Sequence, residues 1–211
     1  MNETLIAIDI ETTGLLPSQH QLMSLSMVEI PSEYIEKISK LEPSNMYVGI
    51  DLKEVRKLTK EIRSLDFTRE VTFYYSHSNY NWQDKAYEYF DNYSKDWEMH
   101  CKPLNNEGFD AWLNDYEKVT FVGHNVAFDL SFINEWCQNN PKINYHSIDT
   151  RTILKFMFYQ DLIGEESQKK PFKCFVIDDV SRHTSLADAR CAAKLFLMLM
   201  LENKTLSGLY Y

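Results

Sequence analysis

The sequence predicts a single α/β domain, and three observations support this fold class. Short apolar runs, each typical of a buried strand, alternate along the chain with segments whose apolar residues recur at helical spacing. The length of 211 residues is enough for one domain with a sizeable core. With 44% hydrophobic and 25% charged residues, the composition differs from those of disordered, collagenous and membrane proteins.

The N-terminal third of the chain contains the clearest strand and helix signals. Residues 5–10 form an apolar run that predicts a strand buried on both faces, and residues 22–30 predict a second strand after a turn. Residues 47–52 indicate a third strand. In residues 52–65 apolar side chains recur at helical spacing with Lys and Arg between them, which predicts an amphipathic helix with a basic outer face.

The C-terminal half continues the alternation of strands and helices. Residues 119–122 predict a short strand, and the helical spacing that follows predicts a helix capped by Asn125. A last strand is expected over residues 144–148. Two further helices are expected over residues 151–159 and 186–201.

Residues 66–118 fit this alternation least well, because they are crowded with Tyr, Trp and Asn. No internal repeat, low-complexity tract or Gly/Ser-rich linker marks a domain boundary in the sequence. We therefore expect one domain over residues 1–211, with residues 66–118 forming an aromatic-rich insertion or cap.

Targeting and redox signals are weak. Residues 1–4 carry no basic stretch, and the apolar run after them is interrupted at once by acidic residues, which is not typical of a secretory signal. The longest apolar run, residues 195–201, is far shorter than the roughly 20 residues that span a bilayer. The 4 cysteines form no Cys-x-x-Cys pair, which argues against a zinc ribbon or a dithiol site. We expect a cytoplasmic protein with reduced thiols and no membrane partner.

The formal net charge of −9 argues against a broad nucleic-acid-binding surface, because neutralisation of phosphates is the main source of such affinity. An enzyme that grips only the end of a strand does not need such a surface. The charge therefore excludes a duplex-coating protein more strongly than an end-processing enzyme.

Two carboxylates end the first predicted strand. Asp9 and Glu11 are two residues apart, so the alternation of a strand places both on one face, beside Ala7. Adjacent like charges are unfavourable unless one side chain is protonated or a divalent cation compensates them. The pair is weak evidence by itself, because a chain with 31 acidic residues often contains this spacing by chance.

Three short motifs give the pair its context. Residues 9–14 (DIETTG) resemble the first motif of the DnaQ-like, or DEDDh, exonuclease family. Residues 123–129 (GHNVAFD) resemble the second motif, and His183 followed five residues later by Asp188 resembles the third. The motifs occur in family order and the resemblance spans about residues 4–200. Taken singly, each aspartate near a helix start could instead be a charge favoured by the helix dipole, and the histidine an ordinary loop residue.

The resemblance implies a ribonuclease-H-like fold, with a mixed sheet and helices on both faces. It also implies that Asp9, Glu11, Asp129 and Asp188 hold two Mg²⁺ or Mn²⁺ ions. His183 would be the general base, and Glu11 would also hold the attacking water or the terminal 3′ hydroxyl. Because five helical residues turn through about 500°, we expect His183 to precede the helix that carries Asp188.

The resemblance further implies a set of residues near the 3′ nucleotide: Thr12, Thr13, Gly14, Leu15, His124, Asn125 and Phe128. The pair Asp149-Thr150 is interpreted as a helix cap. The basic stripe could guide the strand backbone or be a solvated helix face; it consists of Lys53, Arg56, Lys57, Lys60 and Arg63. Five aromatic residues could stack on unpaired bases or pack within the insertion: Phe73, Tyr74, Tyr75, Tyr80 and Trp82.

Together these patterns predict a metal-dependent 3′→5′ exonuclease that releases nucleoside monophosphates from single-stranded DNA or RNA. The expected partner is a single strand with a free 3′ end, and a polymerase or a second copy of the chain is an additional candidate. Two alternatives remain open: a catalytically inactive nucleic-acid-binding module of the same fold, and a proofreading subunit of a DNA polymerase.

Overall fold

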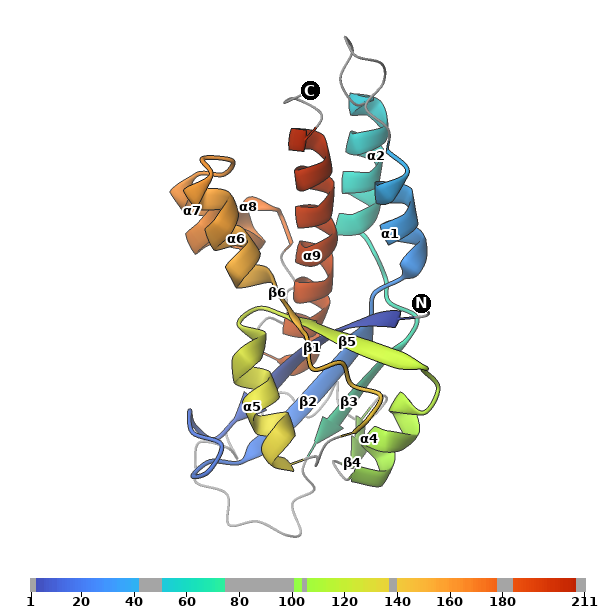
Figure 1. Cartoon of the computed structure of the whole chain (residues 1–211), viewed down its shortest axis with the longest axis vertical. Helices are drawn as coiled ribbons and strands as arrows, with labels where there is room; N and C mark the ends of the chain where they lie inside the picture. The colour runs from blue at the N-terminus through green and yellow to red at the C-terminus, as the bar shows by residue number, and fades with distance from the viewer. Residues whose placement is uncertain are drawn as a thin grey trace.

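The computed structural model describes residues 3–41, 51–74, 101–103, 106–136, 140–177 and 184–207. Within these residues, the strands form one mixed sheet of 6 strands in the order β4-β3-β2-β1-β5-β6 (Figure 1). The strands are β1 (Glu3–Thr12), β2 (Leu22–Glu29), β3 (Glu70–Tyr74), β4 (Cys101–Pro103), β5 (Lys118–Gly123) and β6 (Ile148–Asp149). β1 lies in the middle, antiparallel to β2 and parallel to β5.

Helices cover both faces of this sheet. They are α1 (Ser32–Ser39), α2 (Leu52–Arg63), α4 (Asn106–Leu113), α5 (Val126–Trp136), α6 (Thr150–Tyr159), α7 (Glu165–Lys169), α8 (Pro171–Cys174) and α9 (Ser185–Ser207). Figure 1 shows α9 rising from the sheet between α1 and α2 on one side and α6 to α8 on the other. None of the helices in the described part of the chain has the length and apolar character needed to cross a bilayer.

The two core clusters follow from the alternation of side chains along β1. Ile6 and Ile8 point to one face, where they join a cluster with Phe109 of α4 and Phe132 of α5. Ala7 points to the other face, into a cluster with residues of α1, α2 and α9. The face of β1 that carries Ala7 is therefore the face on which α9 lies.

The predicted fold class is confirmed by this mixed sheet with helices on both faces. The strands expected over residues 5–10, 22–30 and 119–122 all form, as do the helices expected over residues 52–65 and 186–201, with small shifts at their ends.

Two strand predictions need correction. Of the strand expected over residues 144–148, only residue 148 lies in β6, because Asn144 turns the chain: its side chain donates to Glu3 Oε1 at 2.6 Å and accepts from the backbone N–H of His146. Leu52 does not end a strand but begins α2, which Asp51 caps by accepting from the backbone N–H of Lys53. The rest of that expected strand, residues 47–50, lies outside the described residues.

The range expected to be an insertion contributes to the core at both ends. β3 pairs with β2, and its Val71 and Phe73 are buried in the same cluster as Ile8. α4 contributes Phe109 to that cluster. An insertion or cap within residues 66–118 stays a prediction, and residues 75–100 lie outside the part that the structure describes.

Candidate metal centre at the end of strand β1

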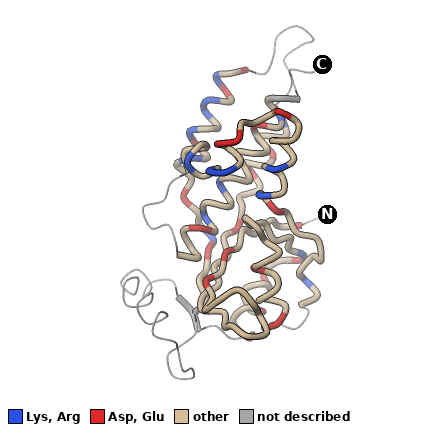
Figure 2. The backbone as a smooth tube through the Cα atoms, turned by 90° about the vertical axis from the view of Figure 1, so that its left-hand side faces the viewer, with Lys and Arg blue, Asp and Glu red and all other residues tan. Residues whose placement is uncertain are grey.

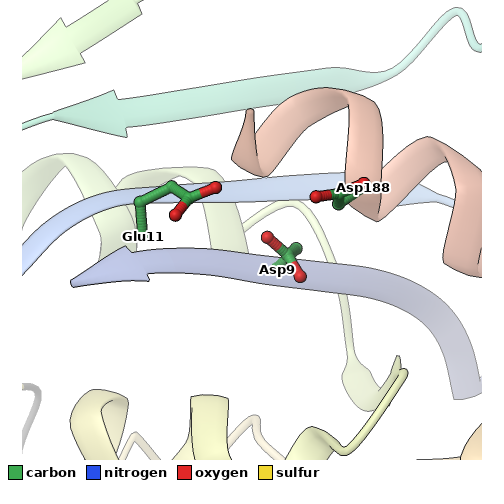
Figure 3. Close-up of side chains that lie close together, drawn as sticks. All are labelled: Asp9, Glu11 and Asp188. Atoms are coloured by element: carbon green, nitrogen blue, oxygen red, sulfur yellow. The ribbon is translucent and has the colours of Figure 1, made fainter. Parts of the chain in front are cut away.

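Three carboxylates meet on the face of β1 that is covered by α9. Asp9 and Glu11 alternate with apolar residues at the end of β1, and Asp188 lies in the first turn of α9. One carboxylate oxygen from each residue lies within 4.8 Å of the others. Figure 3 shows the three side chains directed toward the same space between the strand and the helix. The structure thus brings together residues separated by more than half of the chain.

The electrostatics of this group are dominated by Asp9. Burial raises the pKa of Asp9 well above its ordinary value, and the nearby charges of Asp129, Asp188 and Glu11 raise it further. In the absence of a cation, the group therefore favours a proton on Asp9. A divalent cation would compensate the same charges more fully than one proton.

The fourth predicted ligand, Asp129, lies in the first turn of α5, outside the group of three. Its Oδ1 accepts a hydrogen bond from the backbone N–H of Ile10 at 3.1 Å. The pairing of β1 with β5 ends at Ala7 and Val122, so beyond that point α5 supplies the acceptor that the next strand no longer offers. Burial raises the pKa of Asp129 to about 7.

The chemistry of these side chains fits a hard divalent cation. Carboxylate oxygens are the ligands that Mg²⁺ and Mn²⁺ prefer, and the group of three contains no nitrogen or sulfur donor. Asp129 lies close enough to influence the pKa of Asp9. The arrangement can therefore hold divalent metal, with Asp9 at its centre.

The turn after β1 carries four of the residues expected near the substrate. Thr12 Oγ1 donates to the carbonyl of Gly14 at 2.6 Å, and Thr13 Oγ1 accepts from the backbone N–H of Gln21 at 2.9 Å. A Cβ atom on Gly14 would lie 2.1 Å from the ring of His20, so any larger residue here would have to displace that ring. Leu15 is 77% exposed. The turn is thus closed on itself and presents an apolar side chain to solvent.

The other expected substrate residues lie between β5 and α5 or in the first turn of α5. His124 Nδ1 lies 3.0 Å from Thr150 Oγ1, which donates to the carbonyl of Gly123. Asn125 is exposed and directly precedes α5, in the position of the expected helix cap, and its φ is 75°. Phe128 is partly buried and packs on Phe132.

Asp149 acts as the expected helix cap. Its side chain accepts from the backbone N–H of Arg151 at 3.0 Å and from that of Asn125 at 2.9 Å. One carboxylate therefore caps α6 and also fixes the chain at the start of α5. This second contact joins the ends of β5 and β6 beside the carboxylate group.

The predicted general base, His183, lies outside the described residues, immediately before Thr184. Thr184 caps the last helix, since its Oγ1 accepts from the backbone N–H of Ala187 at 3.2 Å. α9 begins at Ser185, so the histidine precedes the helix in the sequence, as its spacing from Asp188 predicted.

A buried chain of hydroxyl groups beside the carboxylates was missed in the sequence. Ser185 Oγ lies 2.9 Å from Ser24 Oγ and 2.8 Å from Ser26 Oγ, and Ser26 Oγ lies 2.8 Å from Thr72 Oγ1. All four side chains are at least 95% buried. The signal was present, because Ser24 and Ser26 alternate with apolar residues and so share one face of a buried strand.

The two weaker candidates for substrate contact, the basic stripe and the aromatic residues, lie in different surroundings. Arg56, Lys60 and Arg63 line a hollow of about 430 Å³ along α2. Figure 2 shows that most Lys and Arg residues lie among the helices rather than around the sheet. Phe73 is fully buried against Phe109, so of the two alternatives for the aromatic residues it packs in the core and does not stack on bases. Tyr75, Tyr80 and Trp82 lie outside the described residues, as does the side chain of Tyr74.

Comparison with known proteins supports the reading of the motifs. No protein-family model matches the chain. A DNA polymerase III of the PolC type from Thermotoga petrophila is 24% identical over 205 residues, which cover 93% of this chain and 12% of that protein. The crystal structure of E. coli ExoI with single-stranded DNA, in its zinc-bound form, matches with a TM-score of 0.56 at 14% identity. The structural match covers 100% of this chain and 43% of the ExoI chain.

The structural match agrees with the mixed sheet, and the chain spans only a part of each of these proteins. The likeness to the solved structure concerns the fold. The chain therefore has the fold of the DnaQ-like exonucleases, and the resemblance indicated by its three motifs is confirmed.

Proposed function

We propose that this protein is a metal-dependent 3′→5′ exonuclease that hydrolyses single-stranded DNA or RNA and releases nucleoside monophosphates. The observation that carries the proposal is the convergence of Asp9, Glu11 and Asp188 within 4.8 Å, on an exonuclease fold. A group of like charges around a partly buried aspartate is unfavourable without a cation, so a purely structural role does not account for it.

In this proposal Asp9, Glu11, Asp129 and Asp188 hold two Mg²⁺ or Mn²⁺ ions. When bound, such ions would supply positive charge to the scissile phosphate and would make the attacking water more acidic. The role of Asp9 is to lie between the other carboxylates, which is consistent with the charges that raise its pKa. Asp129 contributes from the opposite side of β1, where the backbone N–H of Ile10 fixes its orientation.

The remaining residues would handle the proton and the nucleotide. His183 takes the proton from the attacking water, a role for which an ordinary imidazole pKa near 6.5 is suitable at neutral pH. Glu11 lies at the end of β1 nearest the turn, so it would meet the water or the terminal 3′ hydroxyl. Leu15 would pack on the last nucleotide, since its side chain is exposed on the turn that follows β1.

The substrate proposal follows from the distribution of charge. A net charge of −9 disfavours long-range attraction of nucleic acid, whereas an enzyme that grips a few nucleotides through metal ions can tolerate it. The solved relative was crystallised with single-stranded DNA, which supports a single strand as the substrate of this chain as well. A role beside a polymerase is the second candidate, because the sequence relative is named as a polymerase.

A time course with 5′-labelled single-stranded DNA and RNA and Mn²⁺ would test the proposal. We expect a ladder of products that shorten from the 3′ end, and its absence with Asp9→Asn. His183→Ala should lower the rate by about 10²-fold while Mn²⁺ still binds, as for loss of a general base. Absence of cleavage of both substrates by a wild-type chain that binds Mn²⁺ would favour the inactive binding module. A wild-type rate in His183→Ala would overturn the role of the histidine.

A further inference from the structure

The position of Asp188 depends on how the start of α9 sits on the sheet. The first turns of α9 are rich in small buried residues, namely Ala187, Ala189, Cys191, Ala192 and Ala193. Small side chains allow a helix to approach a sheet closely, but they interlock less than large ones and leave its position along the axis less well defined. A displacement of one residue would move Asp188 by about 1.5 Å along the axis and by about 100° around it.

Ser185 fixes the first residue of this helix. Its hydroxyl group is shared between Ser24 and Ser26 of β2 at 2.9 and 2.8 Å, and its side chain is only 1% exposed. These distances are typical of well-formed hydroxyl hydrogen bonds. A buried hydroxyl group that loses its hydrogen-bond partners is destabilising, so the contact strongly favours one position of the helix.

Arg190 fixes the second turn. Its Nε donates to Glu70 Oε2 of β3 at 2.8 Å, and its Nη2 donates to Oε1 of the same carboxylate. The two parallel hydrogen bonds define both distance and orientation. The Glu70 side chain is 12% exposed, so this ion pair is screened by solvent less than a surface pair.

These two contacts lie on either side of Asp188 in the sequence. Ser185 precedes it by three residues, which places the two side chains on neighbouring positions of one helix face. The partners are in register with the other carboxylates, since Ser26 pairs with Asp9 across the sheet and Ser24 pairs with Glu11. The strand that carries the hydroxyl groups is thus aligned residue by residue with the strand that carries the proposed ligands.

We propose that Ser185 and Arg190 are positioning residues, which hold Asp188 at the distance from Asp9 and Glu11 that a divalent cation requires. This inference rests on the proposed function, because it assigns a role within the same metal site. Groups that orient metal ligands typically contribute about 10- to 100-fold to metal affinity or activity. Neither residue contacts the metal itself in this proposal.

The test compares Mn²⁺ affinity and stability in the same variants. We would measure Mn²⁺ binding to the full chain by electron paramagnetic resonance, for wild type, Ser185→Ala and Arg190→Gln, and thermal unfolding of each in EDTA. Ser39→Ala is the matched control, because its exposed hydroxyl only donates to the carbonyl of Glu36 in α1. We expect Mn²⁺ affinity to fall about 10-fold or more in both variants and to be unchanged in the control.

A second readout separates positioning from general stability. Exonuclease activity of Ser185→Ala should recover at high Mn²⁺ concentration, whereas that of a partly unfolded protein should not. Unchanged Mn²⁺ affinity in Ser185→Ala and Arg190→Gln, measured well below their unfolding temperatures, would overturn the inference. If Ser185→Ala fails to fold, Arg190→Gln decides alone, since its side chain is 34% exposed and more tolerant of change. A wild-type chain that binds no Mn²⁺ would overturn the proposed function, and the inference with it.

Discussion

Strands β1 and β2 lie side by side in the sheet, and on the face covered by α9 both carry polar residues at matching positions. Asp9 pairs with Ser26, and Glu11 pairs with Ser24. The two hydroxyl groups of β2 are completely buried and have partners at 2.8–2.9 Å. The two carboxylates of β1 instead meet a third carboxylate, Asp188, within 4.8 Å.

The difference separates polar groups that stabilise the fold from polar groups that need a ligand. The hydroxyl groups satisfy one another, so they can be buried at little cost and can fix the position of a helix. Like-charged carboxylates cannot satisfy one another, and their charges add to the effect of burial in raising the pKa of Asp9. Two neighbouring strands with the same pattern of alternation can therefore serve structure and chemistry separately.

The largest effect on activity is expected when the charge of Asp9 on β1 is removed, which makes this position neutral like its partner Ser26 on β2. Asp9→Asn keeps the shape of the side chain but removes the charge at the centre of the group. We expect exonuclease activity to fall by about 10³-fold or more, since the loss of metal stabilisation corresponds to several kcal/mol. In EDTA at pH 7 the same variant should unfold at a higher temperature than wild type. A lower unfolding temperature without metal would contradict the account of like-charge repulsion.

The pH dependence of the metal-free protein gives the next largest effect. Burial raises the pKa of Asp129 from 3.8 to about 7, so the folded chain binds this proton more tightly than the unfolded chain does. The contribution to stability is therefore greatest below about pH 4, falls as the pH rises toward 7, and is then constant. We expect the unfolding free energy of wild type in EDTA, relative to Asp129→Asn, to decrease by a few kcal/mol across this range. Urea unfolding at each pH measures it, and a difference independent of pH would refute it.

Addition of Mn²⁺ should compensate the repulsion between the carboxylates at the end of β1 and leave the hydroxyl hydrogen bonds of β2 unchanged. A cation present at about 100 times its dissociation constant stabilises the folded chain by about 2.7 kcal/mol, which raises the unfolding temperature by about 5–10 °C. EDTA should reverse the increase. Asp188→Asn should reduce the increase strongly, whereas an equal increase in that variant would place the cation elsewhere.

The smallest effect is expected from the hydroxyl groups of β2. Ser26→Ala leaves the hydroxyl groups of Ser185 and Thr72 with one partner fewer, which should lower the unfolding free energy by about 1–3 kcal/mol. Because serine carries no charge, the loss should be the same at pH 5 and pH 7 in EDTA. Urea unfolding at the two pH values measures it, and a strong pH dependence would indicate that Ser26 interacts directly with the ionised carboxylates.

Local pattern was sufficient to predict the central strands, the longest helices and the chemical character of the site. Apolar runs predicted that β1 and β2 are strands, and helical spacing predicted that α2 and α9 are helices. These patterns are informative because the burial of one face imposes the period of the element on its apolar residues. The spacing of Asp9 and Glu11 placed both on one face of a strand. The order of three motifs predicted that distant aspartates belong to one site, and the structure brings three of the four predicted ligands within 4.8 Å.

The contacts that hold the site together depend on residues far apart in the chain, and only the tertiary structure identified them. No local pattern shows that Ser185 meets Ser24 and Ser26, because 159 to 161 residues separate them. The hydrogen bond from the backbone N–H of Ile10 to the side chain of Asp129 forms because β5 ends before β1 does. The sequence by itself thus determined which side chains carry charge and which face of each element is buried, since these depend on neighbours a few residues away. The packing of α9 on the sheet decided which charges meet, because that depends on surfaces formed only after the chain has folded.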